Sequence, residues 1–244
     1  MSDIAEKLTT IAENEQKIYD KGVSDEVENV TNRIINADGD RNSWTYAFAF
    51  ANWSGYKFSQ PIVPKRAFQN MFYNCIGMTE LPTPIDFSEL CTEFNWNGAS
   101  YDAYAYRRSV FAYCPNLKEI DLSPTGLNMR AIGGIEEWFL EGSALETIQG
   151  LNVHKDTIYN VSTFAKCNAL MNLTFADEAV IGLDINFKDC SKLSAKSLDN
   201  IVSHLYDYST EAPNTHTLTL HANCWTDELR ARVTALGWKA LPEI

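Results

Sequence analysis

The chain has 244 residues, 45% of them hydrophobic and 21% charged, which is a composition typical of globular proteins. Twenty Lys and Arg against 32 Asp and Glu give a formal net charge of −12. This disfavours nucleic acid and anionic membrane surfaces as partners, because both are bound by clustered basic residues. No apolar stretch approaches the roughly 20 residues of a membrane-spanning helix. The N-terminus is charged from Asp3, unlike a secretory signal peptide, so we expect synthesis in the cytoplasm without export.

An amphipathic helix is predicted over residues 1–35. Its apolar residues follow a 4–3 spacing up to Gly22 and resume one residue out of phase beyond it. The first part of this stripe consists of Ile4, Leu8, Ile11 and Ile18. Such a narrow stripe is typical of a coiled-coil seam and favours a short oligomerisation segment within residues 1–40. The alternative is a helix packed on its own domain, or a frayed tail.

Aromatic residues alternate with small ones directly after this segment. The aromatic positions are Trp44, Tyr46, Phe48 and Phe50. A period of two predicts a strand buried on at least one face, which we interpret as the N-terminal cap or first coil of the following domain. A carbohydrate platform is the alternative, because aromatic faces also stack on sugars.

An internal repeat is the clearest pattern in the chain. Its frame is Phe-x-x-(Cys or Gly)-x-x-apolar-x-x-apolar, with Phe-to-Phe spacings of 39, 28, 25 and 23 residues and a truncated last copy. The first two frame positions are Phe72 and Cys75, Phe111 and Cys114, Phe139 and Gly142, Phe164 and Cys167, and Phe187 and Cys190. Five copies indicate a fold built by stacking equivalent units.

The frame has a simple physical interpretation. Phe and Cys three positions apart share one face of a short helical turn, and the next apolar residues continue into a strand in which, for example, Ile120 and Leu122 point inward. Cys suits a closely packed position because it is small and apolar, and Gly142 suits it by having no side chain. No Cys-x-x-Cys pair and no zinc-finger spacing is present, so we expect buried free thiols, with one incidental disulfide as the alternative.

The frame resembles the leucine-rich repeats of the BspA-like kind, found in bacterial surface proteins and their phages, over roughly residues 60–225. The opening Ile4-Ala5-Glu6-Lys7-Leu8 is similar to the start of repeat proteins encoded in phage and prophage structural-gene regions of gut Firmicutes. The resemblance implies an α/β fold: a leucine-rich-repeat solenoid of about five irregular repeats within residues 41–225, after an N-terminal helical segment and before a C-terminal α/β cap.

The pattern changes at the C-terminal end of the repeats. Ser197 is positioned to cap a helix, and a strand is predicted over 215–221. A second helix is predicted from Asp227 to Leu236, followed by a last short strand that includes Trp238. We expect residues 226–244 to complete the C-terminal cap.

No motif predicts catalysis. The chain has no Gly-x-Ser-x-Gly elbow, no phosphate-binding loop and no His-Glu-x-x-His. His216 and His221 fall on opposite faces of one predicted strand and cannot share a metal there. Glu136 and Glu137 are adjacent, surface-like carboxylates that diverge on a helix. We expect no catalytic residue, no metal and no cofactor.

The long first interval between repeats holds the candidate binding site. Its mixture of aromatic residues with Asn, Gly and Asp is typical of recognition loops on rigid scaffolds. The candidate ligand-binding residues are Asn95, Trp96, Asn97, Tyr101, Asp102, Tyr104, Tyr106 and Arg107. The aromatic side chains would stack on a ring, the amide and carboxylate groups would bond hydroxyls, and the guanidinium would meet an anionic group. The alternative is that Phe94, Trp96 and Tyr101 pack over the neighbouring coils.

These patterns and the resemblance together predict a non-catalytic binding and structural scaffold. The resemblance places it in a phage or prophage virion, in the tail-associated region. There it would present a solenoid surface to a host glycan or protein or contact other virion proteins, with residues 1–35 joining copies. A bacterial cell-surface adhesion module is the first alternative, and a carbohydrate-active enzyme with paired carboxylates is the second.

Overall fold

The computed structural model describes residues 48–50, 69–81, 85, 93–96, 99–102, 108–123 and 134–242. The chain divides into two compact units, Met1–Asp40 and Arg41–Ile244. All described residues belong to the second unit. The helix and oligomerisation segment predicted within residues 1–40 therefore lie outside the described residues, as do Trp44 and Tyr46.

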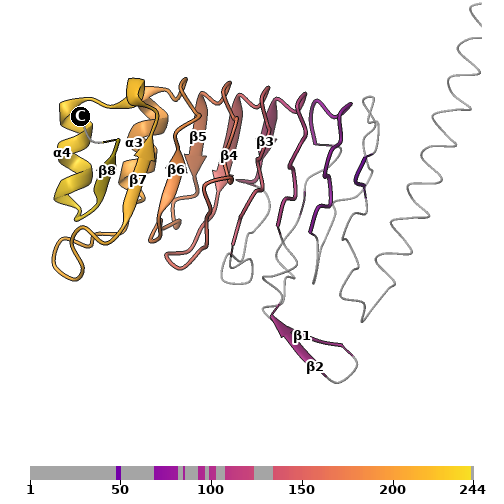
Figure 1. Ribbon diagram of the computed structural model, residues 1–244, viewed down its shortest axis with the longest axis horizontal. Coiled ribbons are helices and arrows are strands. Elements are labelled where there is room, and N and C mark those ends of the chain that lie inside the picture. Colours follow the sequence, from indigo (N-terminus) through magenta and orange to yellow (C-terminus); the bar gives the residue numbers. More distant parts are fainter. Residues whose placement is uncertain are drawn as a thin grey trace, which may run out of the picture. The chain divides into compact units, whose positions relative to one another are not determined.

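Short strands predominate in the described part of the chain (Figure 1). The elements are β1 (Glu93–Trp96), β2 (Ala99–Asp102), β3 (Glu119–Asp121), β4 (Thr147–Leu151), β5 (Asn172–Phe175), β6 (Ile185–Phe187), α3 (Ala195–Ser203), β7 (Thr217–Leu220), the 3-10 helix η3 (Ala222–Cys224), α4 (Asp227–Ala235) and β8 (Lys239–Leu241).

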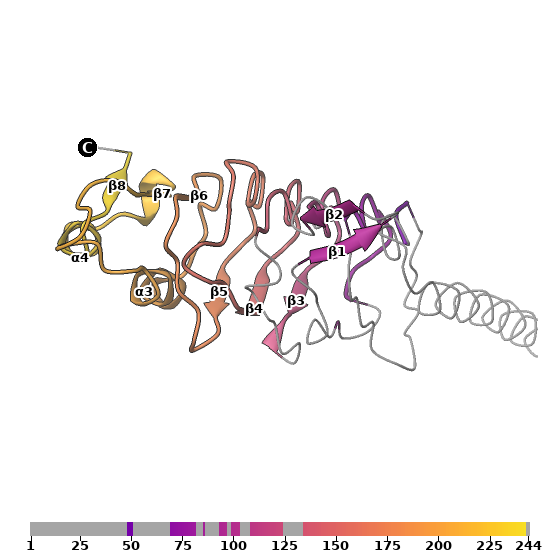
Figure 2. The same cartoon turned by 90° about the horizontal axis from the view of Figure 1, so that it is seen from below.

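Two three-stranded parallel sheets organise these elements, in the orders β3-β4-β5 and β6-β7-β8. In the first sheet Ile120 pairs with Ile148 and Ile148 with Leu173, and all three side chains are buried. Both views show β3, β4 and β5 side by side, with successive turns of the chain following one another (Figure 1 and Figure 2). We call each such turn of the chain, from one repeat Phe to the next, a coil.

A column of stacked phenylalanine rings runs through the interior. Neighbouring centroids are separated by 5.4 Å for Phe48–Phe72, 5.8 Å for Phe72–Phe111, 6.1 Å for Phe111–Phe139, 5.3 Å for Phe139–Phe164 and 4.5 Å for Phe164–Phe187. No ring of this column is more than 5% exposed. The column thus joins all five repeat units, and Phe48 adds a sixth member that the repeat frame does not include.

The cysteines form a second column, and they do more than fill space. Each of the four repeat thiols donates a hydrogen bond to the carbonyl oxygen of a Phe in the preceding coil. The Sγ–O distances are 3.0 Å for Cys75–Phe48, Cys114–Phe72 and Cys167–Phe139, and 3.8 Å for Cys190–Phe164. The five described cysteines are free thiols. Gly142 occupies the same position without a donor, and a Cβ there would lie 3.0 Å from the Phe139 carbonyl oxygen.

The predicted short helical turn between Phe and Cys is wrong. The residue two positions after the Phe has a left-handed backbone, at Phe50, Asn74, Tyr113, Glu141 and Lys166, with φ between 56° and 63°. Its N–H donates to the next coil, for example from Tyr113 to the Leu140 carbonyl at 2.7 Å and from Glu141 to the Ala165 carbonyl at 2.9 Å. A helical turn would direct these N–H groups along its own axis, whereas the left-handed residue directs them to the neighbouring coil.

Helix α3 begins one turn earlier than predicted, because Ser194 is its N-cap rather than Ser197. Ser197 lies within the first turn and is 2% exposed. Its hydroxyl accepts from the Leu173 N–H at 2.9 Å and donates to the Met171 carbonyl at 2.9 Å. Ser197 therefore ties α3 to β5.

The last strand, β8, has two consecutive carbonyl groups bonded by side chains of the C-terminal region. Nη1 of Arg230 donates to the Ala240 carbonyl at 2.8 Å, and Nε1 of Trp225 donates to the Leu241 carbonyl at 2.9 Å. The Arg230 guanidinium also lies 4.5 Å from the centroid of the Trp225 ring. The Ala240 carbonyl faces away from β7 and is already bonded, so it is not available to a further strand.

Candidate functional site

The predicted binding loop contains a β-hairpin. Strand β1 pairs with β2 in antiparallel fashion, and Asn97 and Gly98 between them lie outside the described residues. So do three more of the predicted ligand-binding residues, Tyr104, Tyr106 and Arg107. The structure thus bears on four of the eight candidates.

The strand register distributes these four over two faces. Phe94 pairs with Tyr101 and Trp96 with Ala99, whereas Asn95 pairs with Ser100 and Glu93 with Asp102. Because positions alternate between the faces of a hairpin, Trp96 and Tyr101 share one face and Asn95 and Asp102 share the other. The register is the only information that the structure gives on these four residues, and their role in ligand binding stays a prediction.

A second surface is built by the residues two positions after each column Phe, which we call the turn row. Its members are Phe50, Asn74, Tyr113, Glu141, Lys166 and Asp189. All of them except the last, Asp189, have the left-handed backbone. Backbone hydrogen bonds of 2.7 to 2.9 Å link the row residues Phe50, Asn74, Tyr113 and Glu141 each to the following coil. The row therefore places one residue of each coil beside its neighbour at fixed spacing.

Phe50 corrects the prediction for the N-terminal aromatic stripe. The alternation predicted Phe48 and Phe50 on the same side, but Phe48 is 5% exposed and Phe50 is 65% exposed. The left-handed conformation of Phe50, with φ 63°, accounts for the difference, because an extended strand would have kept both rings on one face. Phe50 belongs to the outside of the coil and Phe48 to the core.

Tyr73 and Tyr113 extend the aromatic character of this surface to the next two coils. The Tyr73 ring lies 5.7 Å from that of Phe50 and 5.1 Å from that of Tyr113. Neither tyrosine was predicted from the sequence as a surface residue. No repeat signal marks them, since Tyr73 stands one position after its Phe and Tyr113 stands two positions after its own.

The later part of the turn row is charged. Lys166 forms an ion pair with Glu141, and its backbone N–H donates to a carboxylate oxygen of Asp189 at 2.9 Å. The hydrogen bond and charge of Glu141 raise the pKa of the exposed Lys166 ammonium. The row thus passes from aromatic to paired charged residues between Tyr113 and Glu141.

The two adjacent glutamates of the third coil differ in environment. Glu136 is 9% exposed and forms an ion pair with Arg108 at 3.3 Å, so its description as surface-like was wrong. Glu137 accepts a hydrogen bond from the Ser109 hydroxyl at 2.8 Å. Each carboxylate has its own partner in the preceding coil, which is a structural arrangement rather than an acid/base pair.

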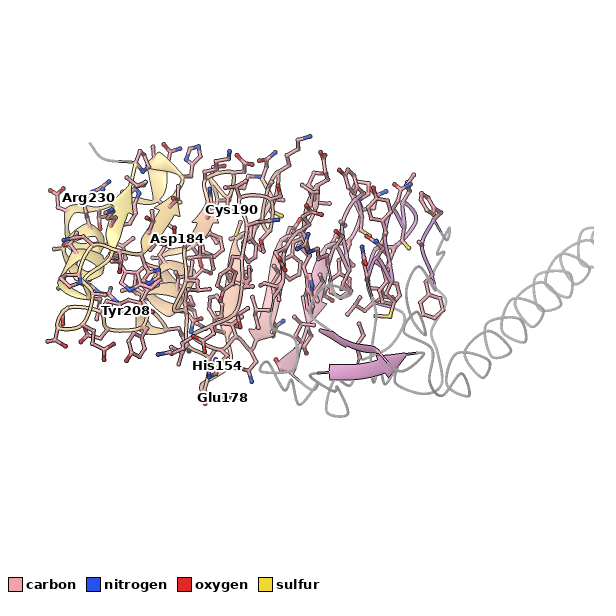
Figure 3. The ribbon with its side chains drawn as sticks, turned by 60° about the horizontal axis from the view of Figure 1, so that its bottom comes forward. His154, Glu178, Asp184, Cys190, Tyr208 and Arg230 are labelled. Atoms are coloured by element: carbon pink, nitrogen blue, oxygen red, sulfur yellow. The ribbon has the colours of Figure 1, made fainter. Side chains whose placement is uncertain are left out.

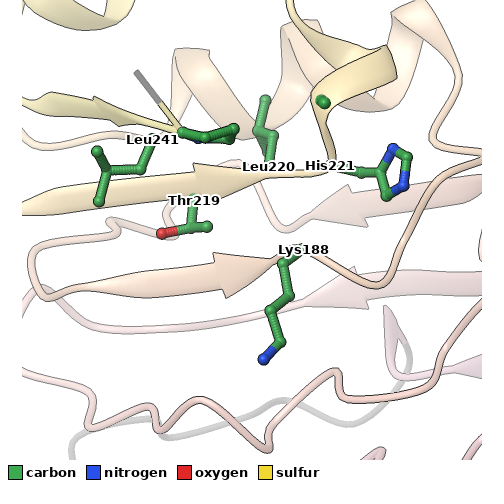
Figure 4. Close-up of a pocket in the computed structure, with 7 residues that line it drawn as sticks. Lys188, Thr219, Leu220, His221 and Leu241 are labelled. Carbon is green, nitrogen blue, oxygen red and sulfur yellow. The ribbon is translucent and has the colours of Figure 1, made fainter. Parts of the chain in front are cut away.

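An open groove of about 690 Å³ lies at the carboxyl ends of β6, β7 and β8 (Figure 4). Its lining residues are Lys188, Thr219, Leu220, His221, Ala222, Leu241 and Pro242. His221 belongs to this groove, whereas His216 pairs with Asp184 at 3.5 Å. The two histidines have separate partners.

The buried thiols are poor nucleophiles. Burial raises the pKa of Cys167 to about 12 and also raises that of Cys190, and hydrogen bonding to Cys75 together with burial raises that of Cys114. A thiol must ionise to react. Cys190 lies within the stack, while the labelled Glu178 and Asp184 are exposed (Figure 3).

The described part of the chain contains no cluster of three or more His, Cys, Asp or Glu side chains that could hold a metal ion. Within the same residues, no helix is long and apolar enough to cross a membrane.

No protein-family model matches the chain, and comparison with curated proteins and with solved structures found no match. The geometry of the coils is therefore the main guide to function.

Proposed function

We propose that this chain is a leucine-rich-repeat solenoid of the α/β class that acts as a non-catalytic binding scaffold. Its ligand is a glycan or protein on a bacterial host surface. The observation that carries the proposal is the turn row, in which successive coils place one outward residue at the same position. Repeat proteins use such aligned outer positions as extended binding surfaces.

The interior supports this role because it holds the coils at a regular spacing. The Phe rings stack at 4.5 to 6.1 Å, and the thiols bond the preceding coil from within. Outer side chains of the turn row contribute little to these contacts. They can therefore be selected for a ligand rather than for the fold.

The phage context is part of the proposal and rests on the sequence resemblance. In a virion, residues 1–35 would join copies or attach the chain to other tail-associated proteins, and the coils would face the host. Mass spectrometry of purified phage particles from a strain that carries the gene tests this location. Finding the chain only in the cell-envelope fraction would favour the adhesion module instead.

The binding role is tested by adsorption of the full chain to purified cell walls from a panel of Firmicutes. We expect the chain to cosediment with some walls and to release no reducing sugar from them. The same walls stripped of polysaccharide serve as the control for a protein ligand. Failure to adsorb to any wall would contradict the scaffold proposal, and release of reducing sugar would show an enzyme.

A Trp96→Ala variant in the same assay separates the hairpin from the coils. Unchanged adsorption by this variant would assign binding to the coils, and lost adsorption would assign it to the aromatic face of the hairpin.

A further inference from the structure

We propose that Phe50, Tyr73 and Tyr113, here called the aromatic strip, bind a chain of neutral sugar rings. This inference rests on the proposed scaffold function and names its surface and ligand class. The three rings lie on three successive coils, with centroid separations of 5.7 and 5.1 Å and tilts of 65° and 57°. Phe50 is 65% exposed, Tyr113 is 36% exposed and Tyr73 is half-buried.

The strip differs from the core column in exposure to solvent. Column rings such as Phe72 and Phe111 are at most 1% exposed, and their neighbours cover them on both sides. The ring of Phe50 gains little from such packing, since most of its surface meets solvent. Its aromatic character is therefore not explained by the stability of the fold.

The backbone adds a second argument. Phe50 and Tyr113 have φ values of 63° and 61°, a region that bulky side chains occupy at a cost and that Asn and Gly favour. Asn74 has the same conformation in the coil between them, with φ 56°. The turn thus forms with Asn, and Phe and Tyr at the flanking coils are less favourable choices for folding alone.

The size of the strip favours a glycan over a protein. A large aromatic side chain offers about 150–250 Å², so three partly exposed rings present roughly 300 Å². Each partner of a stable protein complex contributes about 800 Å². A sugar ring needs only one aromatic face for its apolar C–H groups, and a glycan chain follows a single file of rings.

The surroundings of the strip suit hydroxyls and a neutral ligand. Asn74 is half-buried beside Tyr73, and the exposed Asn116 in the next coil donates to the Ile76 carbonyl at 2.7 Å, which leaves its amide oxygen directed elsewhere. The charges of the turn row begin only at Glu141, which is neutralised by Lys166. The three strip residues and Asn74 are themselves uncharged, which suits a neutral ligand.

The test replaces the strip residues with the amino acid that their backbone prefers. Tyr113→Asn and Phe50→Asn remove a ring and relieve the left-handed strain, so the full chain is expected to stay at least as stable towards denaturant as the wild type. Lys166→Asn is the matched control, because it introduces the same amino acid at the same left-handed position of a later coil without removing a ring. Binding is measured against immobilised neutral hexasaccharides of glucose, galactose, rhamnose and N-acetylglucosamine.

We expect the wild type and Lys166→Asn to bind at least one hexasaccharide, and each strip variant to bind it about tenfold more weakly, the effect of losing one well-stacked ring. Wild-type affinity in both strip variants would overturn the proposal. Adsorption of the wild type to cell walls without binding to any hexasaccharide would overturn the ligand class and leave the scaffold function standing. Adsorption to walls stripped of polysaccharide would point to a protein ligand and would also overturn the proposed glycan ligand. Binding to neither walls nor hexasaccharides would remove both proposals.

Discussion

Replacing Phe139 by Ala tests whether packing within the Phe column stabilises the fold of the repeat domain. The ring is 0% exposed and lies between Phe111 at 6.1 Å and Phe164 at 5.3 Å, with Trp138 edge-on at 6.2 Å. Truncation to Ala leaves a hole bordered by three aromatic side chains. These neighbours are held by their own coils and cannot close it completely.

The expected loss follows from this packing. Phe→Ala substitutions at fully buried positions lower the free energy of unfolding by about 3–5 kcal/mol. Two stacked neighbours place Phe139 near the upper part of that range, because each aromatic pair adds about 0.5–1.5 kcal/mol beyond the area buried. For a unit of this size each kcal/mol lowers Tm by about 2–4 °C. We therefore expect Tm to fall by about 10–15 °C.

Equilibrium unfolding in urea, followed by circular dichroism, measures the change. Phe50→Ala is the matched control, since it removes the same atoms from a ring that is 65% exposed, and it should change the free energy of unfolding by less than about 1 kcal/mol. A loss for Phe139→Ala no larger than that for Phe50→Ala would refute the column as the core.

Three further predictions concern the thiols and the close approach of coils. At pH 8 the native chain should leave Cys75, Cys114, Cys167 and Cys190 unmodified by iodoacetamide, and urea should expose all four; rapid native labelling detected by mass spectrometry would contradict their burial. Burial raises the pKa of Cys167 from 9.0 to about 12, so the stabilisation linked to this thiol is complete below pH 9 and is lost as the pH rises towards 12. Over this range the Cys167 thiol should lower the free energy of unfolding by about 1.4 kcal/mol per pH unit. Urea titrations of Cys167→Ala should therefore show a smaller fall with pH than the wild type, and an equal fall would contradict the prediction. Gly182→Ala should lower the free energy of unfolding by about 2 kcal/mol or more, because its Cβ would meet the Lys155 carbonyl oxygen at 2.2 Å. Gly142→Ala, whose nearest contact would be 3.0 Å, should cost clearly less, and equal losses in thermal melts would show that the close approach at Gly182 is relieved by backbone movement.

Much of the interior could be predicted from the sequence because burial follows spacing. A Phe followed by Cys or Gly after three residues and Leu after six recurs along the chain, and the described residues at these positions are buried, for example Phe164, Cys167 and Leu170. Periodicity reports which side chains share an environment. It carried no information on the hydrogen bond from each thiol to the preceding coil, because the small size of the Cys side chain was already enough to explain its presence at the fourth position of the frame.

The outer surface could not be predicted in the same way. Left-handed backbone at Tyr113, Glu141 and Lys166 has no residue signature, and it is imposed by the carbonyl groups and the Asp189 carboxylate that receive their N–H groups from the next coil. Phe48 escaped the repeat frame because Ala51 stands where the other copies have Cys or Gly, so the alternation of aromatic residues dominated the interpretation.

The hairpin of the candidate site could have been predicted from the sequence, whereas the exposed positions of Tyr73 and Tyr113 could not. Asn97-Gly98 between two alternating segments is the sequence signal of a two-residue hairpin connection, so β1 and β2 could have been predicted. The register then follows, and it separates Trp96 from Asn95. Tyr73 and Tyr113 required knowledge of where each turn faces, which depends on contacts between distant residues.

The bond from the Lys166 N–H to the Asp189 side chain marks a change in how the chain is joined from one layer to the next. In the layers that precede this bond, the corresponding main-chain N–H donates to a main-chain carbonyl of the next layer. A duplicated segment inserted among these layers could therefore form the same hydrogen bonds with the layers on both sides. In the layers that follow this bond, the chain is joined by pairing of the strands β6, β7 and β8, and Arg230 bonds the last of these strands. Gene duplication could thus lengthen this protein from its middle, while its C-terminal end would have to remain unaltered.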